Sequence, residues 1–134
     1  MTNIYEQGLA RNQANYAPLT PLSLLSRVER VYPDHPAVIH GKLCYSWRQT
    51  TERCRRLASA LVKRGIGRGD TVAIIAPNTP AIFEAHFGVP MAGAILNALN
   101  IRLDAATLSF ILEHGEAKAV ITDSEFSPLM RSVL

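Results

Sequence analysis

The feature that most constrains the fold is a regular alternation of apolar runs and helical patterns in the second half of the chain. Residues 71–76, TVAIIA, form a β-branched apolar run, which is typical of a strand buried on both faces. Similar runs occupy residues 94–98 and 118–122, and helical patterns begin at Thr79-Pro80 and at Asp104. Strands that alternate with helices through short links form a parallel sheet. The sequence therefore predicts an α/β fold with a parallel βαβαβ unit.

The first half of the chain predicts an arm, a helix and a hairpin. Thr20 and Pro21 suit an N-cap and the first helical position, because proline has no N–H to leave unbonded there. Residues 1–20 would form an arm before this helix. Residues 37–40 and 43–46 are short strand-like runs around Gly41-Lys42, which suits a tight β-hairpin.

A second helix is expected from Ser46 to about Arg64. Ser46 and Gln49 have the spacing of a capping box, in which the two side chains satisfy free N–H groups in the first turn. Gly65 stands where a C-terminal cap glycine is expected. One apolar face is expected from Trp47, Cys54, Leu57, Ala58 and Leu61.

Three alternate glycines, in RGIGRGDTVAII, raise the question of a nucleotide site. Gly65, Gly67 and Gly69 follow a helix and precede a strand, whereas a dinucleotide fingerprint follows a strand and opens a helix. The helix end that faces them is the negative end of its dipole, which repels phosphate. No Walker-type phosphate loop occurs either. We interpret the glycines as a helix cap and a turn.

Seven of the fourteen basic residues lie between Arg48 and Arg68, and the net charge is +3. Such a run can mark a nucleic-acid-binding surface, but aromatic residues are absent from it apart from Trp47 on the apolar face. Glu52 stands at helical spacing from Arg55 and Arg56, where ion pairs form. We favour a solvated helix face, with nucleic-acid binding as the alternative.

No complete catalytic or metal-binding group is present. The four histidines form no metal-binding motif, and no nucleophile elbow occurs. Asp70, Asp104 and Asp123 stand at element boundaries, where capping explains them. Cys44 and Cys54 have no partner at metal-ligand spacing, so both are expected to be reduced and packed. We predict no catalytic residue and no metal site.

The N-terminus has no signal-peptide pattern, and the apolar stretch over residues 81–99 is too interrupted for a membrane span. The expected compartment is therefore the cytoplasm. The last residues continue an apolar helical pattern without a cap, and parallel sheets need helices on both faces, which this sequence supplies sparingly. We expect the chain to be the beginning of a larger protein, truncated at its C-terminal side and able to self-associate through exposed apolar surface.

Several stretches together resemble the N-terminal part of the AMP-forming acyl-CoA synthetases, or ligases, of the adenylate-forming superfamily. They are the aromatic-Ser-aromatic entry to a helix, Tyr45-Ser46-Trp47; the stretch GDTVAIIAPNTP; and the strand from Gly93-Ala94 that leads to Asn100-Ile101-Arg102-Leu103. The resemblance extends from about Pro21 to Pro128. Within the family it is strongest to the short- and medium-chain ligases, including the methylmercaptopropionate–CoA ligase branch.

The resemblance implies an enzyme of fatty acid metabolism that first joins a carboxylate to AMP from Mg-ATP and then transfers the acyl group to CoA. It implies that residues 21–134 are an incomplete N-terminal subdomain of a larger, multi-layered domain. The family's phosphate loop, ribose-binding Asp and mobile-domain Lys are not in this sequence, so this piece is expected to be inactive and to bind ATP, Mg²⁺ and CoA weakly or not at all. One residue carries over as a cofactor contact: Arg102, near the CoA phosphates, with an ordinary surface arginine as the alternative.

One further class stays open beside the ligase and the nucleic-acid binder. A free-standing, non-catalytic α/β interaction module would fit the same elements, and a Rossmann oxidoreductase is disfavoured by the position of the glycines.

Overall fold

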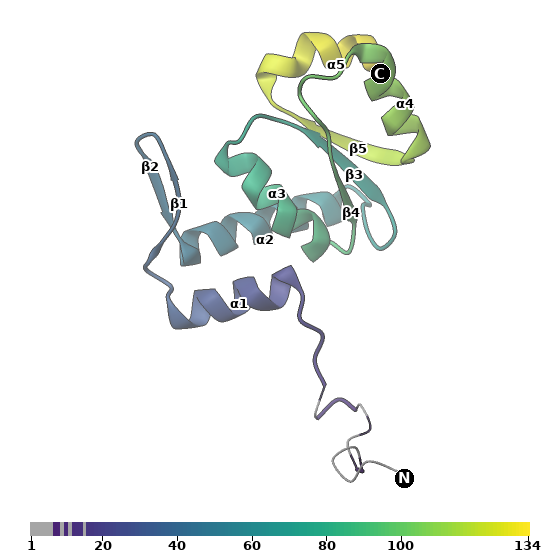
Figure 1. Ribbon diagram of the computed structural model, residues 1–134. Helices are drawn as coiled ribbons and strands as arrows, with labels where there is room; N and C mark the ends of the chain where they lie inside the picture. Colours follow the sequence, from purple (N-terminus) through teal and green to yellow (C-terminus); the bar gives the residue numbers. More distant parts are fainter. Residues whose placement is uncertain (1–6, 9, 11, 15) are drawn as a thin grey trace.

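The computed structural model describes residues 7–8, 10, 12–14 and 16–134 (Figure 1). Of the arm predicted over residues 1–20, the described residues contain turns but neither helix nor strand, and the others lie outside the described part. The elements follow in the order α1 (Pro21–Val31), β1 (Pro36–His40), β2 (Leu43–Ser46), α2 (Trp47–Lys63), β3 (Thr71–Ile75), α3 (Pro80–Met91), β4 (Ile95–Ala98), α4 (Ala105–His114), β5 (Ala117–Thr122), a short 3₁₀ turn (Ser124–Phe126) and α5 (Ser127–Val133).

The sheet is parallel, and the first of its strands along the chain lies in the middle. Its strand order is β4-β3-β5, so the chain leaves β3 for one edge and then crosses to the other. Both pairings are parallel, with Val72 opposite Leu96 on β4 and opposite Ala119 on β5. The predicted βαβαβ unit is therefore confirmed, and its strands differ from the expected ranges by one residue at the end of β3 and at the starts of β4 and β5.

Helices cover both faces of this sheet, with α2 and α3 on one side and α4 and α5 on the other (Figure 1). Because side chains alternate along a strand, Val72 and Ile74 pack with the α2–α3 side, and Ala73 and Ile75 with the α4–α5 side. All four are essentially fully buried, and each large one contributes about 1.5–3 kcal/mol. The expectation that this sequence covers the sheet sparingly was wrong for β3.

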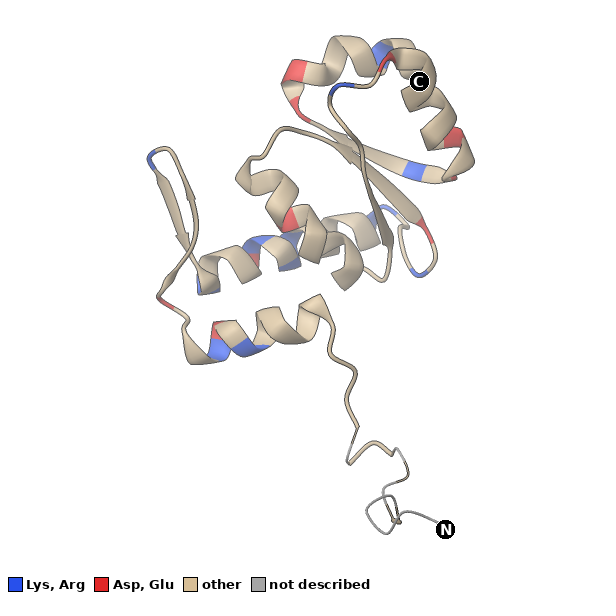
Figure 2. Cartoon of the chain, viewed as in Figure 1, with Lys and Arg blue, Asp and Glu red and all other residues tan. Residues whose placement is uncertain are grey.

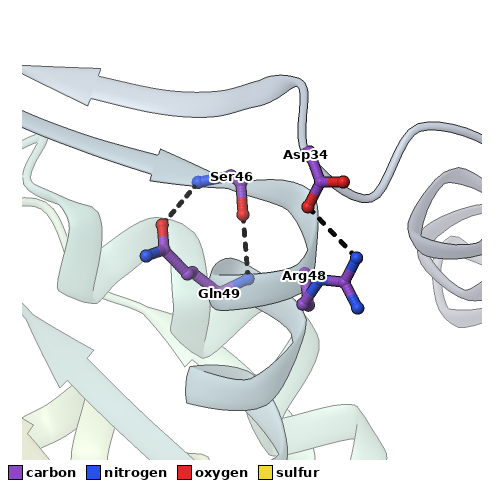
Figure 3. Close-up of polar contacts among 4 residues, drawn as sticks. All are labelled: Asp34, Ser46, Arg48 and Gln49. Carbon is purple, nitrogen blue, oxygen red and sulfur yellow. Dashed lines mark hydrogen bonds and ion pairs between the residues drawn. The ribbon is translucent and has the colours of Figure 1, made fainter.

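The β1–β2 hairpin leads directly into α2, and the predicted capping box is present (Figure 3). The Gln49 N–H donates to Ser46 Oγ at 3.3 Å, and the Ser46 N–H donates to Gln49 Oε1 at 2.9 Å. Arg48 in the same turn pairs with Asp34 at 3.1 Å, just before the hairpin. The cap and the ion pair together fix where the hairpin ends and the helix begins.

The glycine-rich segment ends α2 and turns the chain into β3. Gly65 has a φ of +80°, the Gly65 N–H donates to the Val62 carbonyl, and the Ile66 N–H donates to the Leu61 carbonyl. These two bonds are those of a Schellman cap, which favours glycine because its backbone is left-handed. The predicted helix cap and turn are confirmed.

Helix α3 packs closely on α2, and its first turn has no side-chain cap. A Cβ at Gly88 would lie 2.8 Å from Leu57 Cδ2 and 3.0 Å from the Cys54 carbonyl oxygen, so only glycine allows this approach. Thr79 occupies the N-cap position but makes no side-chain cap bond, and its hydroxyl is buried without a partner. Pro90 lies inside the last turn, and α3 ends one residue later at Met91, as the missing proline N–H predicts.

Candidate functional site

Arg102, the one predicted cofactor contact, lies in the loop that joins β4 to α4. The Leu99 N–H donates to the Ile74 carbonyl at 2.8 Å, which extends the pairing with β3 beyond the end of β4. Asn100 then forms an Asx-type turn, because its Oδ1 accepts the Arg102 N–H at 3.0 Å. The backbone of Arg102 is thus held in a defined position next to the end of the strand.

The nearest carboxylate along the chain is already engaged elsewhere. Asp104 caps α4 and accepts bonds from the Thr107 N–H and the Thr107 hydroxyl, both at 2.9 Å. These two bonds hold the pKa of Asp104 below its usual range. The Arg102 side chain is exposed and has no hydrogen bond or ion pair with any other residue in the described part of the chain.

The loops that follow β3, β4 and β5 share the carboxyl edge of the sheet. In open α/β sheets this is the edge at which ligands bind. The Asp123 carboxylate, after β5, accepts the Glu125 N–H at 3.1 Å and caps the 3₁₀ turn. A free guanidinium at such an edge suits a phosphate or carboxylate group, which it can bind through two parallel hydrogen bonds. This edge thus presents one exposed guanidinium, the kind of group to which an anion would bind.

At the opposite edge of the sheet, where the strands begin, the negative charge of Asp70 disfavours the binding of an anion. Its carboxylate accepts the Gly67 N–H at 2.8 Å and pairs with Lys118 Nζ at 2.5 Å. The Lys118 ammonium, and then the Gly67 N–H, lower the pKa of Asp70. An acidic group therefore already accepts the Gly67 N–H of the glycine turn. The interpretation of Asp70 as a capping residue was wrong, because its carboxylate closes the turn at Gly67 and pairs with Lys118 on β5.

More than half of the basic run is paired with acids within the molecule, and Figure 2 shows basic and acidic segments on α1, α2 and α3. Four of its arginines pair with acids: Arg48 with Asp34, Arg53 with Glu84, Arg55 with Glu29, and Arg56 with Glu52. The predicted pair of Glu52 with Arg56 is confirmed, but Arg55 reaches across to α1 instead. The geometry with Glu29 is bidentate, 2.6 Å at both contacts, and Arg55 lowers the pKa of Glu29. These pairs favour a structural role for the basic face.

The sequence reasoning missed a buried charge between α2 and α3. Glu84 is only 7% exposed and accepts the Arg53 Nε–H at 2.5 Å. The Arg53 guanidinium also lies 4.7 Å from the centre of the Tyr45 ring on β2, a cation–π distance. The sequence signal that could have identified this buried charge was the position of Glu84 as the only acid in a largely apolar helix. The pair links three elements and is far from Arg102 in the sequence.

The remaining candidate groups are the two cysteines and the possible metal ligands, and they form no second binding site in the described part of the chain. Burial raises the pKa of the Cys54 thiol to about 11, so it stays protonated, as expected of a packed cysteine. Cys44 is exposed, and its predicted packing was wrong. Among the residues that the structure describes, no three His, Cys, Asp or Glu side chains are placed to hold a metal ion. No described helix is long and apolar enough to cross a membrane.

One open groove of about 630 Å³ lies between the hairpin and the start of α3. Its walls are mainly apolar, from Val38 and Ile39 on β1 and from Ile82, Phe83 and Phe87 on α3. Sequence reasoning did not predict it, because it depends on how the hairpin sits beside α3.

Known proteins resemble this chain in sequence. The family described as AMP-binding enzyme matches residues 25–133. The acetate/butyrate–CoA ligase AAE7 of Arabidopsis thaliana, named as peroxisomal, is 56% identical over 126 residues, which are 94% of this chain and 22% of the relative. The acetate–CoA ligase CCL3 of Humulus lupulus is 54% identical over 126 residues, with the same coverage. The chain thus spans about a fifth of the length of these relatives.

Solved structures agree with this fold. A benzoate CoA ligase from Burkholderia xenovorans LB400 superposes with a TM-score of 0.80 at 25% identity, over 84% of this chain and 23% of that one. The inhibitor-bound N-terminal domain of FACL13 from Mycobacterium tuberculosis gives a TM-score of 0.79 at 28% identity, over 82% of this chain and 28% of that one.

Proposed function

Since the chain belongs to the AMP-binding enzyme family, we propose that it is the N-terminal part of an AMP-forming acyl-CoA ligase. The observation that carries this proposal is the family match over residues 25–133, together with relatives above 50% identity that are named acid–CoA ligases. Residues 21–134 would be an incomplete N-terminal subdomain, and residues 1–20 an arm before it.

The parent enzyme would form an acyl-adenylate and pyrophosphate from a carboxylate and ATP, and then a thioester with release of AMP. Such chemistry needs groups that neutralise the phosphates and a metal ion that clamps them. The described residues supply no cluster of metal ligands, so the groups that hold Mg²⁺ and the ATP phosphates would come from elsewhere in the parent. Apart from the one cofactor contact proposed below, the part played by this chain would be structural, with its β-sheet and helices forming one portion of the large domain.

Arg102 is the residue of this chain that we assign to a cofactor. Its position at the carboxyl edge of the sheet and its lack of an acidic partner support a contact with the phosphates of CoA. In the full-length enzyme we expect Arg102→Ala to raise the KM for CoA about tenfold or more, which corresponds to a lost charged hydrogen bond. Carboxylate-dependent exchange of pyrophosphate into ATP, which needs no CoA, should change little.

A matched control for this variant is Arg131→Ala on α5, since Arg131 is also exposed and forms no ion pair with another described residue. The control should leave the KM for CoA unchanged, and Arg102→Lys should restore part of the affinity. An unchanged KM in Arg102→Ala would remove the assignment and leave Arg102 as a surface residue.

We propose a short-chain carboxylic acid as the substrate, because two relatives above 50% identity are named for acetate or butyrate. Pyrophosphate exchange by the full-length enzyme should be compared for acetate, butyrate, methylmercaptopropionate, a long-chain fatty acid and benzoate. Highest kcat/KM with acetate or butyrate supports this choice. A preference for methylmercaptopropionate would instead support the finer branch expected from the sequence motifs, and a preference for benzoate or the long-chain acid would contradict both.

Compartment and partners follow from the same proposal. We propose the cytoplasm as the location of the protein, and imaging of the tagged full-length protein would distinguish it from the peroxisome, which appears in the name of AAE7. We propose no nucleic-acid partner, because four of the basic residues are already paired. Salt-sensitive retention on DNA would contradict this.

A further inference from the structure

The loop that carries Arg102 is a single tight turn, and its first residue supplies two hydrogen-bond acceptors. The Leu103 N–H donates to the Asn100 carbonyl at 3.3 Å, which closes the turn over residues 100–103. The Asn100 side chain adds a second bond inside the turn, because its Oδ1 accepts the Arg102 N–H at 3.0 Å. Asparagine is favoured at the first position of a turn for this reason. The orientation of the Arg102 backbone therefore depends on the Asn100 side chain.

The turn is anchored to the molecule on both sides. Before it, Leu99 is 6% exposed and belongs to the apolar cluster on the α4–α5 face of the sheet. After it, Leu103 packs against the same cluster, and Asp104 caps α4. Asn100 and Arg102 are exposed between these anchors. The hydrogen bond from Arg102 to Asn100 thus restrains the part of the loop that packing does not hold.

The Arg102 guanidinium has no partner that would hold it before a ligand binds. It forms no ion pair with another described residue. Ordering a long, free side chain opposes binding, and a group that already has the bound geometry binds its ligand more tightly. The place from which the guanidinium projects is set by the Arg102 backbone. This is the part of the binding geometry that the chain fixes in advance.

We propose that Asn100 is a positioning residue for the contact of Arg102 with CoA. Its Oδ1 holds the Arg102 backbone so that the guanidinium is presented to a phosphate of CoA at the carboxyl edge of the sheet. Asn100 acts through Arg102 and needs no contact with CoA of its own. This inference rests on the proposed function, because it takes the contact between Arg102 and CoA from there.

The test is the Kd for CoA of the full-length enzyme, measured by calorimetry in the presence of AMP. Asn100→Ala should weaken CoA binding about threefold to tenfold, and less than Arg102→Ala does, because the guanidinium remains but is no longer held in place. Asn100→Ser should recover part of the affinity, because a serine hydroxyl forms the same kind of turn bond more weakly.

A matched control in the same turn is Ile101→Ala. It shortens a side chain that is 39% exposed and keeps both hydrogen bonds of Asn100. The Kd for CoA should therefore stay unchanged in this variant. A loss equal to that of Asn100→Ala would mean that any change in the loop weakens binding, and it would overturn the proposal.

The double variant Asn100→Ala/Arg102→Ala separates positioning from other roles. If Asn100 acts through Arg102, the double variant should bind CoA as weakly as Arg102→Ala alone, within about twofold, because coupled residues are not additive. A further loss of about threefold or more would assign Asn100 a separate role and overturn the proposal. Since Asn100 is exposed, the urea midpoint of Asn100→Ala should change little. Lowered stability together with weaker ATP binding would show a general structural role instead, and would also overturn it.

The same measurements separate the failure of this inference from the failure of the proposed function. Weakened binding in Arg102→Ala beside unchanged binding in Asn100→Ala contradicts the positioning role alone. An unaltered enzyme that binds no CoA, or an unchanged Kd in Arg102→Ala, contradicts the proposed function and the role of Asn100 with it.

Discussion

At the scale of single residues, the buried carboxylate of Glu84 is the group whose pairing matters most for the free energy of the α2–α3 contact. A buried charge is tolerated only when it is paired and hydrogen-bonded. Arg53 supplies the partner, and its hydrogen bond to Glu84 raises the pKa of the guanidinium. The pair therefore acts as a specific clamp between two helices that are otherwise joined by apolar contacts.

Replacing Arg53 should cost more than replacing an arginine in an exposed pair. We expect Arg53→Met to lower the free energy of unfolding by about 1–3 kcal/mol, because it leaves the Glu84 carboxylate buried without a donor. The matched control is Arg56→Met, whose partner Glu52 is exposed; it should cost less than about 0.5 kcal/mol. Urea denaturation measures both, and equal costs would show that the Glu84 pair has no special weight.

The ion pair between Asp70 and Lys118 should appear in the pH dependence of stability. The folded-state pKa of Asp70 is lowered, so the contribution of this carboxyl is present above its unfolded pKa of about 4 and is lost as the pH falls through the folded value. Lys118→Met should therefore flatten the loss of stability below about pH 4. Thermal melts from pH 7 to pH 2 would test this, and an unchanged acid limb would contradict it.

At the scale of secondary-structure elements, the contact of α2 with α3 depends on a glycine. We expect Gly88→Ala to destabilise the chain by about 1–3 kcal/mol through overpacking against Leu57 and the Cys54 backbone, although alanine favours helices by about 1 kcal/mol. Gly67→Ala is the control, because its Cβ would meet nothing within 4 Å and its φ is not positive. A stabilised Gly88→Ala variant would mean that the helices can separate freely.

The N-terminal cap of α2 gives a second test at this scale. Ser46→Ala removes the acceptor of the Gln49 N–H and should cost about 1 kcal/mol. Ser59→Ala, on the exposed face of the same helix, should be neutral or slightly stabilising. Equal melting temperatures for the two variants would contradict a role for the cap.

The elements that could be predicted from the sequence are those with local causes. The capping residues of α1, α2 and α4, the glycine that ends α2 and the hairpin turn at Gly41 all depend on neighbours within a few positions. The pairs of Arg55 with Glu29 and of Arg53 with Glu84 join residues 26 and 31 positions apart, and no local pattern shows them. The strand order β4-β3-β5 and the groove beside α3 likewise depend on packing. Arg102 was identified through a family resemblance, and its role stays a prediction.

At the scale of the whole molecule, the described chain leaves much apolar surface in contact with solvent. Ile39 on the hairpin, Ile95 on β4 and Phe110 on α4 are 72%, 56% and 65% exposed. Scattered apolar residues are normal on a protein surface, but a groove and an unpaired strand edge in addition are typical of a surface that another part of a protein covers.

The 134-residue chain by itself should therefore bind a hydrophobic dye or self-associate, and the full-length enzyme should do so less. Dye fluorescence at equal molar concentration and light scattering would measure both. A monomeric short chain with cooperative melting and no dye binding would contradict our proposal that other parts of the enzyme cover this surface.

The central claim is that this chain belongs to an enzyme that makes acyl-CoA with the release of AMP. Its most direct test is to incubate the purified full-length protein with ATP, Mg²⁺, CoA and acetate or butyrate, and to quantify the nucleotide and thioester products. We predict one AMP and one pyrophosphate for each thioester, and none of these products from the 134-residue chain alone. Production of ADP, or a folded full-length protein that forms no thioester with any acid in the panel, would contradict the account.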